Sequence, residues 1–149
     1  AVTCPALTTL FNTGWIMTTQ PGLLPEPPEG WQGSKPEWAF YASLVELGYQ
    51  PDEDFTYQSP LMGGRLDKGG VVIDFMFTNP PNLAVNVQGV YYHYELGAET
   101  KSRDLFARQS LVAQGITLIF VDEDDLEQDP IGVTREALQF RDKSRLGGR

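Results

Sequence analysis

The stretch GGVVIDFMFTNPPNLAVNVQG, residues 69–89, decides the fold of this chain. Its two apolar runs, 69–79 and 83–89, are joined by Asn79-Pro80-Pro81-Asn82. Asparagine and proline favour turns, while valine, isoleucine and phenylalanine favour strands, so the pattern predicts two strands in a hairpin-like pair. One acid, Asp74, interrupts the first run.

Asp74 is the first candidate functional residue, because a carboxylate within an apolar strand is costly to bury unless it is paired or binds a cation. One interpretation places it at a strand edge, where it faces water or hydrogen-bonds to neighbouring backbone. The other makes it a metal ligand, since Mg²⁺ binds carboxylate oxygens held on rigid elements. The sequence leaves both interpretations open.

Two predicted elements come before the hairpin. Residues 34–48 form a helix that begins after the N-cap Ser34, tolerates Pro36 in its first turn and ends at Gly48. Residues 54–61 form the first strand.

Three predicted elements follow the hairpin. Residues 99–115 form a helix with Leu105, Arg108, Leu111 and Val112 near one face. Residues 116–122, ITLIFVD, form an apolar strand that should be buried on both faces, which favours parallel pairing. A last helix covers residues 134–141. The sequence therefore predicts an α/β fold, with a mixed central β-sheet flanked by helices.

The chain of 149 residues divides into three predicted segments. Residues 1–33 are rich in Pro and Gly and form an extended N-terminal arm, residues 34–128 form the α/β core, and residues 129–149 form a C-terminal helix and basic tail. Apolar residues in the arm, among them Trp31, indicate that it lies either on its own domain or on a partner, which would be another protein or a second copy of the chain.

Composition limits the classes of function. The net charge is −9, which argues against non-specific binding to DNA, although the C-terminal end is basic and residues 121–129 hold six acids. The single cysteine, Cys4, excludes an internal disulfide and a cysteine-based zinc cluster. No apolar stretch approaches the roughly 20 residues that span a bilayer, and the N-terminus lacks a secretory pattern, so we expect a cytoplasmic protein without a membrane partner.

Four more residues could carry chemistry. Glu37 completes a capping box with Ser34, and a structural role is as plausible as a functional one. His93 is the only histidine, and it either packs among tyrosines or takes part in proton transfer. Asp104 and Arg108 are four residues apart on the second helix, where they could pair with each other.

The order of these residues resembles that of the PD-(D/E)XK nuclease superfamily, in particular the branch of very-short-patch-repair endonucleases and related small endonuclease-like domains. The resemblance extends from about Ser34 to Leu126. It rests on DF in a strand, a hairpin turn, an apolar strand ending in Gly, an aromatic pair with His, the pattern D-x-x-x-R-x-x-L-x-x-x-G, and an apolar strand followed by acids.

The resemblance implies a restriction-endonuclease-like core that hydrolyses DNA phosphodiester bonds with Mg²⁺ or Mn²⁺. It makes Asp74 the central metal ligand, with the backbone carbonyl of Val87 beside the metal. His93 and Asp104 would position and activate water, and Glu37 would be a helix acid near the site. Arg108 would be structural or would contact a phosphate.

The chain departs from the family pattern on the third strand, where most members have an acid, any residue and a lysine. This chain has Asn86-Val87-Gln88. Asparagine offers a metal a neutral oxygen, and glutamine orients water but does not stabilise developing charge as a cation does. The branch's zinc-binding cysteines are absent too. Three interpretations stay open: an active endonuclease, a binding or structural subunit that keeps the fold without catalysis, and a fortuitous match in an unrelated α/β domain.

Overall fold

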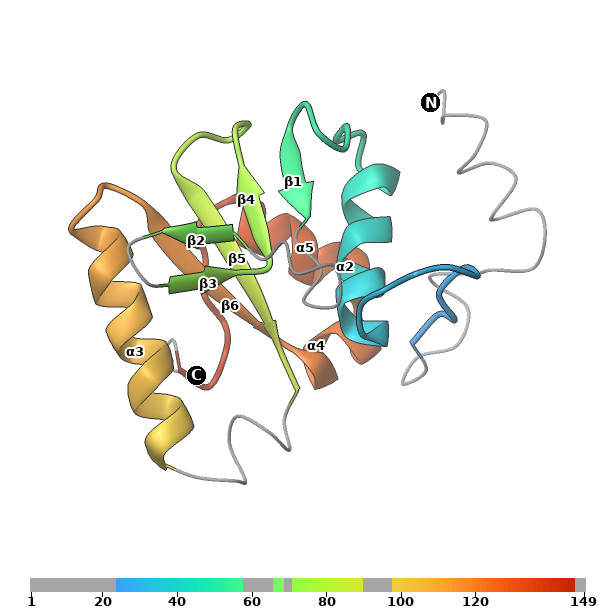
Figure 1. The fold of residues 1–149 in the computed structure, drawn as a ribbon. Helices are drawn as coiled ribbons and strands as arrows, with labels where there is room; N and C mark the ends of the chain where they lie inside the picture. The colour runs from blue at the N-terminus through green and yellow to red at the C-terminus, as the bar shows by residue number, and fades with distance from the viewer. Residues whose placement is uncertain (1–23, 58–65, 69–70, 90–97, 147–149) are drawn as a thin grey trace.

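The computed structural model describes residues 24–57, 66–68, 71–89 and 98–146. Its elements follow the chain in the order α2 (Lys35–Glu46), β1 (Phe55–Tyr57), β2 (Leu66–Lys68), β3 (Val71–Ile73), β4 (Phe75–Phe77), β5 (Leu83–Gln88), α3 (Ala98–Val112), β6 (Thr117–Asp122), α4 (Glu123–Gln128) and α5 (Pro130–Leu138) (Figure 1). The fold is therefore mixed α/β, as the sequence predicts.

The main sheet has four strands in the order β1-β4-β5-β6. β1 pairs antiparallel with β4, and β4 pairs antiparallel with β5, which confirms the predicted hairpin. β5 and β6 are parallel, as the apolar run 116–122 indicates. α3 connects these two strands, as a parallel crossover requires.

The predicted single strand 69–79 is divided in the structure. β3 and β4 are separate, with Asp74 between them, and β3 pairs with β2 in a second sheet of two strands. At the point of division the Asp74 peptide N–H donates to the side-chain oxygen of Asn86 at 2.8 Å instead of continuing the β ladder.

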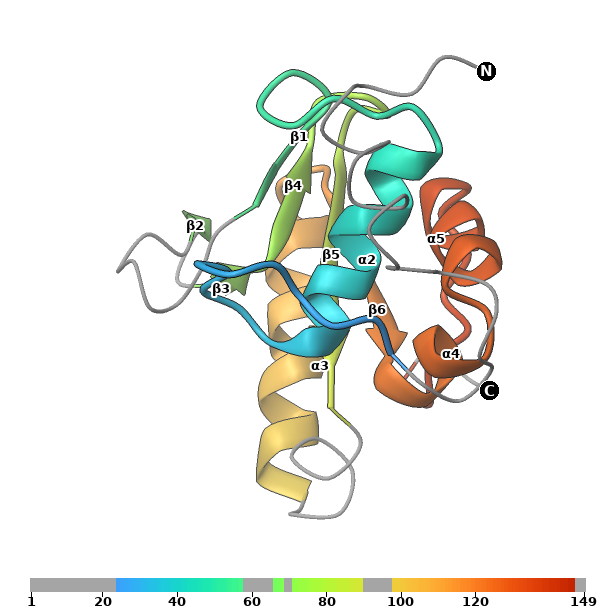
Figure 2. The same ribbon diagram turned by 90° about the vertical axis from the view of Figure 1, so that its right-hand side faces the viewer.

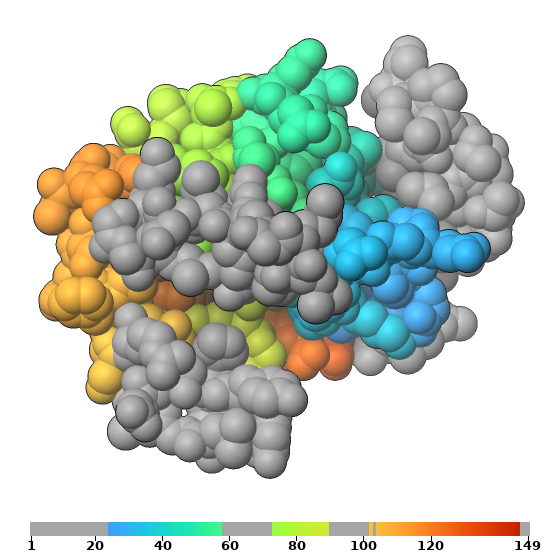
Figure 3. Space-filling view, viewed as in Figure 1, coloured from blue at the N-terminus to red at the C-terminus, as the bar shows by residue number. Residues whose placement is uncertain are grey.

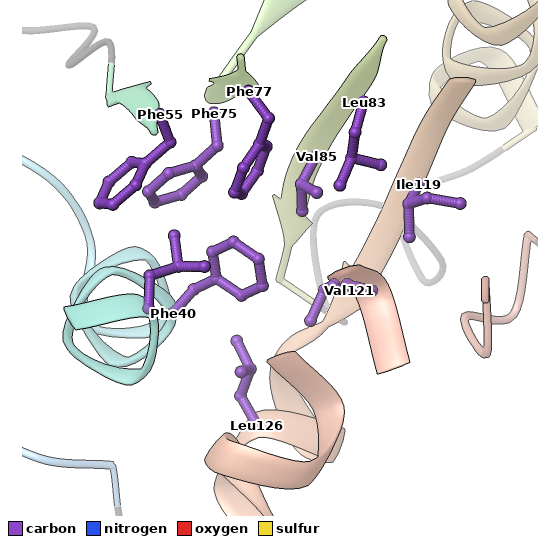
Figure 4. Packing of buried hydrophobic residues seen from close by; sticks show 11 residues of the cluster. Phe40, Phe55, Phe75, Phe77, Leu83, Val85, Ile119, Val121 and Leu126 are labelled. Atoms are coloured by element: carbon purple, nitrogen blue, oxygen red, sulfur yellow. The ribbon is translucent and has the colours of Figure 1, made fainter. Parts of the chain in front are cut away.

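Side chains alternate between the two faces of the main sheet, as the strand period of two requires. One face is covered by α2, α4 and α5 (Figure 2). Its core contains Phe40, Leu44, Phe55, Phe75, Phe77, Leu83, Val85, Ile119, Val121, Leu126 and Ala137 (Figure 4). Aromatic rings dominate it, and the Phe40 and Phe75 ring centroids lie 4.9 Å apart in an edge-to-face arrangement.

α3 covers the opposite face of the sheet and lies at the outer margin of the molecule (Figures 1 and 3). Leu111 is fully buried against Ala84, Leu118 and Phe120. Leu105 and Val112, predicted near one face with it, are 42% and 60% exposed. The prediction of a shared face is wrong for these two, because the inward face follows residues 104, 107, 108 and 111.

The helix ends agree with the local signals. Ser34 caps α2 in a capping box with Glu37, and Gly48 follows the helix with φ of 98°. The predicted last helix, 134–141, is α5, which begins earlier because the Asp129 side chain accepts from the Gly132 N–H and Pro130 starts the first turn. α4, formed by the acidic run, is not predicted.

The structure describes the predicted N-terminal arm only from Leu24 onward. Residues 1–23 lie outside the described residues. Leu24 packs against the core, and Trp31 stacks on Tyr57 with ring centroids 4.8 Å apart, so this part of the segment lies on its own domain. Among the described residues no helix is long and apolar enough to cross a bilayer.

Candidate metal-dependent catalytic site

Six of the predicted site residues gather at one edge of the main sheet, which we call the site edge: Glu37, Asp74, Asn86, Val87, Gln88 and Asp104. It is formed by the ends of β1, β5 and β6, together with Asp74 at the start of β4. The strand register sets this arrangement, because Tyr57 faces Phe75, Phe75 faces Val85, and Gln88 faces Asp122. Asp74 therefore lies beside the last residues of β5.

Asp74 is 3% exposed and is held at two points by β5. Its Oδ2 atom accepts a hydrogen bond from the Val87 backbone N–H at 3.0 Å, and its own N–H donates to Asn86 Oδ1 at 2.8 Å. A buried carboxylate requires such donors, since each compensates part of the lost hydration. The interpretation of Asp74 as hydrogen-bonded to neighbouring backbone is therefore confirmed, and a carboxylate oxygen retains lone pairs for a cation.

Asn86 and Val87, both predicted metal ligands, take part in this arrangement. The Asn86 side-chain oxygen accepts from the Asp74 N–H, and Val87 contributes its N–H. An amide oxygen has two lone pairs, so this hydrogen bond and a metal contact are compatible at Asn86. Metal binding by either residue stays a prediction.

Gln88 joins the end of β5 to α3. Its side chain is 1% exposed, and its Nε2 atom donates to Asp104 Oδ2 at 2.9 Å. The structure thus brings together two residues that are 16 apart in sequence and that the sequence places on different elements. A direct bond between this strand and the second helix was not predicted.

Glu37 forms the predicted capping box and one further bond. Its Oε2 atom accepts from the Ser34 N–H at 3.2 Å and the Ser34 hydroxyl at 2.7 Å, while its Oε1 atom accepts from the Tyr57 hydroxyl at 2.8 Å. A Cβ atom at Gly33 would lie only 2.0 Å from that hydroxyl oxygen, so a larger residue at position 33 would displace the Tyr57 side chain. Glu37 therefore fixes the start of α2 to the end of β1.

Arg108 is paired with Asp142 of the C-terminal segment, not with Asp104. Its guanidinium carbon lies 4.8 Å from the centre of the Phe120 ring, in a cation–π contact. Asp142 also accepts the Phe120 backbone N–H at 3.1 Å. These contacts give Arg108 a structural role, one of the two roles predicted for it. No sequence pattern indicates Asp142 as its partner.

A second group of acids lies at the end of β6. Carboxylate oxygens of Asp122, Asp124 and Asp125 all lie within 4.8 Å of one another. Arg145 compensates part of this charge, with contacts of 3.1 Å to Asp122 and 2.6 Å to Asp124. The acidic run and the basic tail are both visible in the sequence, but their pairing is not.

His93 belongs to residues 90–97, which lie outside the described part of the chain. The structure therefore places Asp74, Asn86, Val87, Gln88, Asp104 and Glu37 but not the predicted histidine. Comparison of the chain with protein-family models, curated proteins and solved structures found no match. The chemistry of the site has to be argued from the residues themselves.

Proposed function

We propose that the chain is an endonuclease-like domain that hydrolyses DNA phosphodiester bonds with Mg²⁺ or Mn²⁺, built on a restriction-endonuclease-like core. One observation carries the proposal. The last three residues of β5 hold two acids from different parts of the chain: Asn86 and Val87 are hydrogen-bonded to Asp74, which precedes β4, and Gln88 is hydrogen-bonded to Asp104 of α3. These are residues that the resemblance to the PD-(D/E)XK superfamily assigns to the site.

The order of elements supports the same proposal. α2 precedes the antiparallel strands β1, β4 and β5, and α3 then leads to the parallel strand β6. Of the residues of the resemblance that the structure describes, Glu37 lies on α2, Asp74 lies directly before β4, Val87 lies on β5 and Asp104 lies on α3. The pairing of β4 with β5 positions Asp74 beside β5, so the sheet, and not a single loop, determines where this carboxylate lies.

The donor set at the site edge fits a hard divalent cation. The Asp74 carboxylate, the Asn86 amide oxygen and the Val87 carbonyl offer oxygen atoms, which Mg²⁺ and Mn²⁺ prefer. A bound cation of this kind polarises a phosphoryl oxygen and lowers the pKa of bound water. In the proposal Asp74 and the Val87 carbonyl would hold the cation and His93 would take the proton from water, while Asp104 would orient the His93 imidazole or a second hydrated cation.

A second candidate function is a binding or structural subunit that keeps the fold without catalysis. The observation that favours it is that the two amide side chains of β5 are both hydrogen-bonded to acids of the site. Asn86 accepts from Asp74 and Gln88 donates to Asp104, and neither supplies the positive charge of a lysine. In that case the N-terminal arm would bind a protein partner or a second copy of the chain.

The test is cleavage of supercoiled plasmid and single-stranded DNA with Mg²⁺, Mn²⁺ or EDTA. Asp74→Asn is the main variant, because its remaining oxygen still accepts from the Val87 N–H and protects the fold. Asp52→Asn is the matched control, since Asp52 is exposed and has φ of 67°, a conformation that asparagine tolerates. His93→Ala examines the proton acceptor.

We expect metal-dependent cleavage that Asp74→Asn abolishes and Asp52→Asn leaves intact. Cleavage that survives Asp74→Asn would exclude this site as its source. If the natural chain cuts neither substrate with either metal, the enzyme proposal is wrong and the binding subunit becomes the better description.

A further inference from the structure

β5 presents two amide side chains toward the face that α3 covers. Residues 84, 86 and 88 share one face of the strand, and Ala84 packs in the cluster that contains Leu111 of α3. Asn86 accepts from the Asp74 N–H, and Gln88 donates to the Asp104 carboxylate. Each amide thus contacts one acid of the proposed site. Asn86 does so through its amide oxygen, and Gln88 does so through its amide nitrogen.

The hydrogen bond between Gln88 and Asp104 joins a buried donor to a half-buried acceptor. Gln88 is 1% exposed, and its Nε2 atom lies 2.9 Å from Asp104 Oδ2. An amide N–H directs an acceptor as well as an ammonium does, but it brings no formal charge to the carboxylate. At the neighbouring end of β6 the arrangement differs, since Asp122 is bonded by the cationic Arg145.

We propose that Gln88 is a positioning residue, which fixes the Asp104 carboxylate for a divalent cation and contributes no positive charge that would compete with that cation. The inference rests on the proposed function, because it assumes that the site edge binds a metal. It also differs from the expectation of the family pattern, in which a lysine at this position supports catalysis. Lysine, the family residue at this position, should weaken cation binding here, since its ammonium would pair with Asp104.

The test measures Mn²⁺ binding by calorimetry and by the electron paramagnetic resonance signal of free Mn²⁺. Gln88→Met removes the donor but keeps the length and suits a buried position, and Gln88→Lys keeps a donor but adds charge. Gln109 is an exposed glutamine on α3, so Gln109→Met and Gln109→Lys are matched controls. Urea unfolding confirms that each variant is folded.

A spectroscopic signal tests whether Gln88 holds the Asp104 carboxylate in solution, and the metal affinity then tests what that contact does. The carboxylate ¹³C resonance of Asp104 reports its hydrogen bonding directly, with or without metal. It should move in Gln88→Met and stay in place in Gln109→Met. Removal of a partner that orients a metal ligand typically lowers metal affinity about 10- to 100-fold, and we expect this loss in both Gln88 variants and less than about twofold in the controls.

The outcomes are distinct. If the natural chain binds Mn²⁺ and Gln88→Lys binds it equally well or more tightly, the inference is overturned while the proposed function stands. The inference is overturned as well if the carboxylate ¹³C resonance of Asp104 does not move in Gln88→Met. If the natural chain binds no Mn²⁺, the proposed function fails, and the inference that depends on it fails too.

Discussion

Tyr57 shows how one hydroxyl connects two elements near the site. It donates to Glu37 at 2.8 Å, while its ring stacks on Trp31 and packs against Phe75. The ring contacts survive a change to phenylalanine, but the hydrogen bond does not. The energy of that bond can therefore be measured separately from the packing.

We expect Tyr57→Phe to lower the free energy of unfolding by about 1–2 kcal/mol, because a hydrogen bond to a charged group is lost and part of a carboxylate is left without its donor. Urea unfolding followed by tryptophan fluorescence measures the difference. Tyr49→Phe is the control, since Tyr49 packs at the edge of the same core and its hydroxyl makes no hydrogen bond to the described residues. Equal stability of Tyr57→Phe and the natural chain would mean that the Glu37 contact contributes nothing.

Glu123 gives a prediction of pH dependence. Burial raises the pKa of its carboxyl above the ordinary 4.5, and the neighbouring carboxylates of Glu127 and Asp124 raise it further. A group whose pKa is raised by folding stabilises the protein in its protonated form, fully so below its unfolded pKa. This contribution disappears as the pH rises through the folded value.

Glu123→Gln, which remains neutral, should therefore raise the urea midpoint at neutral pH, and this gain should vanish below about pH 4. The control is Glu46→Gln, which also removes one negative charge, from the exposed end of α2. A gain of the same size in Glu46→Gln would assign the effect to net charge. A gain that grows toward acidic pH would contradict the raised pKa.

At the scale of elements, the C-terminal segment after α5 fastens α3 to β6. Asp142 Oδ2 accepts from the Arg108 guanidinium and from the Phe120 backbone N–H, while Oδ1 accepts from the Ser144 N–H at 2.9 Å. Arg145, in the same segment, binds Asp122. The segment therefore connects α3 to β6 and supplies an acceptor for one backbone N–H of this outer strand.

Asp142→Ala should lower the free energy of unfolding by about 2–4 kcal/mol, because it leaves the half-buried Arg108 and the Phe120 N–H without their acceptor. Lys143→Ala is the adjacent control, and its exposed pair with Glu136 predicts a change of less than about 1 kcal/mol. Equilibrium urea unfolding distinguishes the two. A loss in Asp142→Ala no larger than in Lys143→Ala would show that the segment does not hold α3.

At the scale of the whole molecule, the sequence predicted what depends on neighbours in the chain. The ends of α2 follow from Ser34 and Gly48, and the burial of β6 on both faces follows from its uninterrupted apolar run. The division of the strand at Asp74 depends on Asn86, 12 residues away, and the partner of Arg108 lies 34 residues away. Such contacts form only once the sheet is assembled, so no local pattern reveals them.

The candidate site follows the same rule. The position of Asp74 within an apolar run identified it as unusual, because burial of an acid is costly unless the acid has a partner. The hydrogen bond between Gln88 and Asp104 could not be predicted from the sequence, since a glutamine in a strand and an acid in a helix are both ordinary by themselves. The parallel pairing of β5 with β6 and the crossover helix between them bring the two side chains together.

The distribution of charge over the molecule predicts how DNA would be bound. The net charge is −9, and five described cations are already in ion pairs: Lys35, Arg108, Arg141, Lys143 and Arg145. Affinity for duplex DNA falls with salt in proportion to the number of phosphates that cations neutralise. Because the net charge is strongly negative and these five cations are already paired, we expect a shallow dependence on salt.

For Asp74→Asn, which should bind without cutting, we expect the affinity for duplex DNA to fall by about tenfold or less between 50 and 200 mM salt, as for one or two neutralised phosphates. Fluorescence anisotropy of a labelled duplex with Mg²⁺ measures it, and EDTA is the control. A fall of 10³-fold or more would require many phosphate contacts and would contradict the charge distribution described here. Because Asp74→Asn lacks the central carboxylate of the site edge, its affinity should be the same with Mg²⁺ and with EDTA, and a requirement for Mg²⁺ would place the cation that attracts the phosphates elsewhere on the molecule.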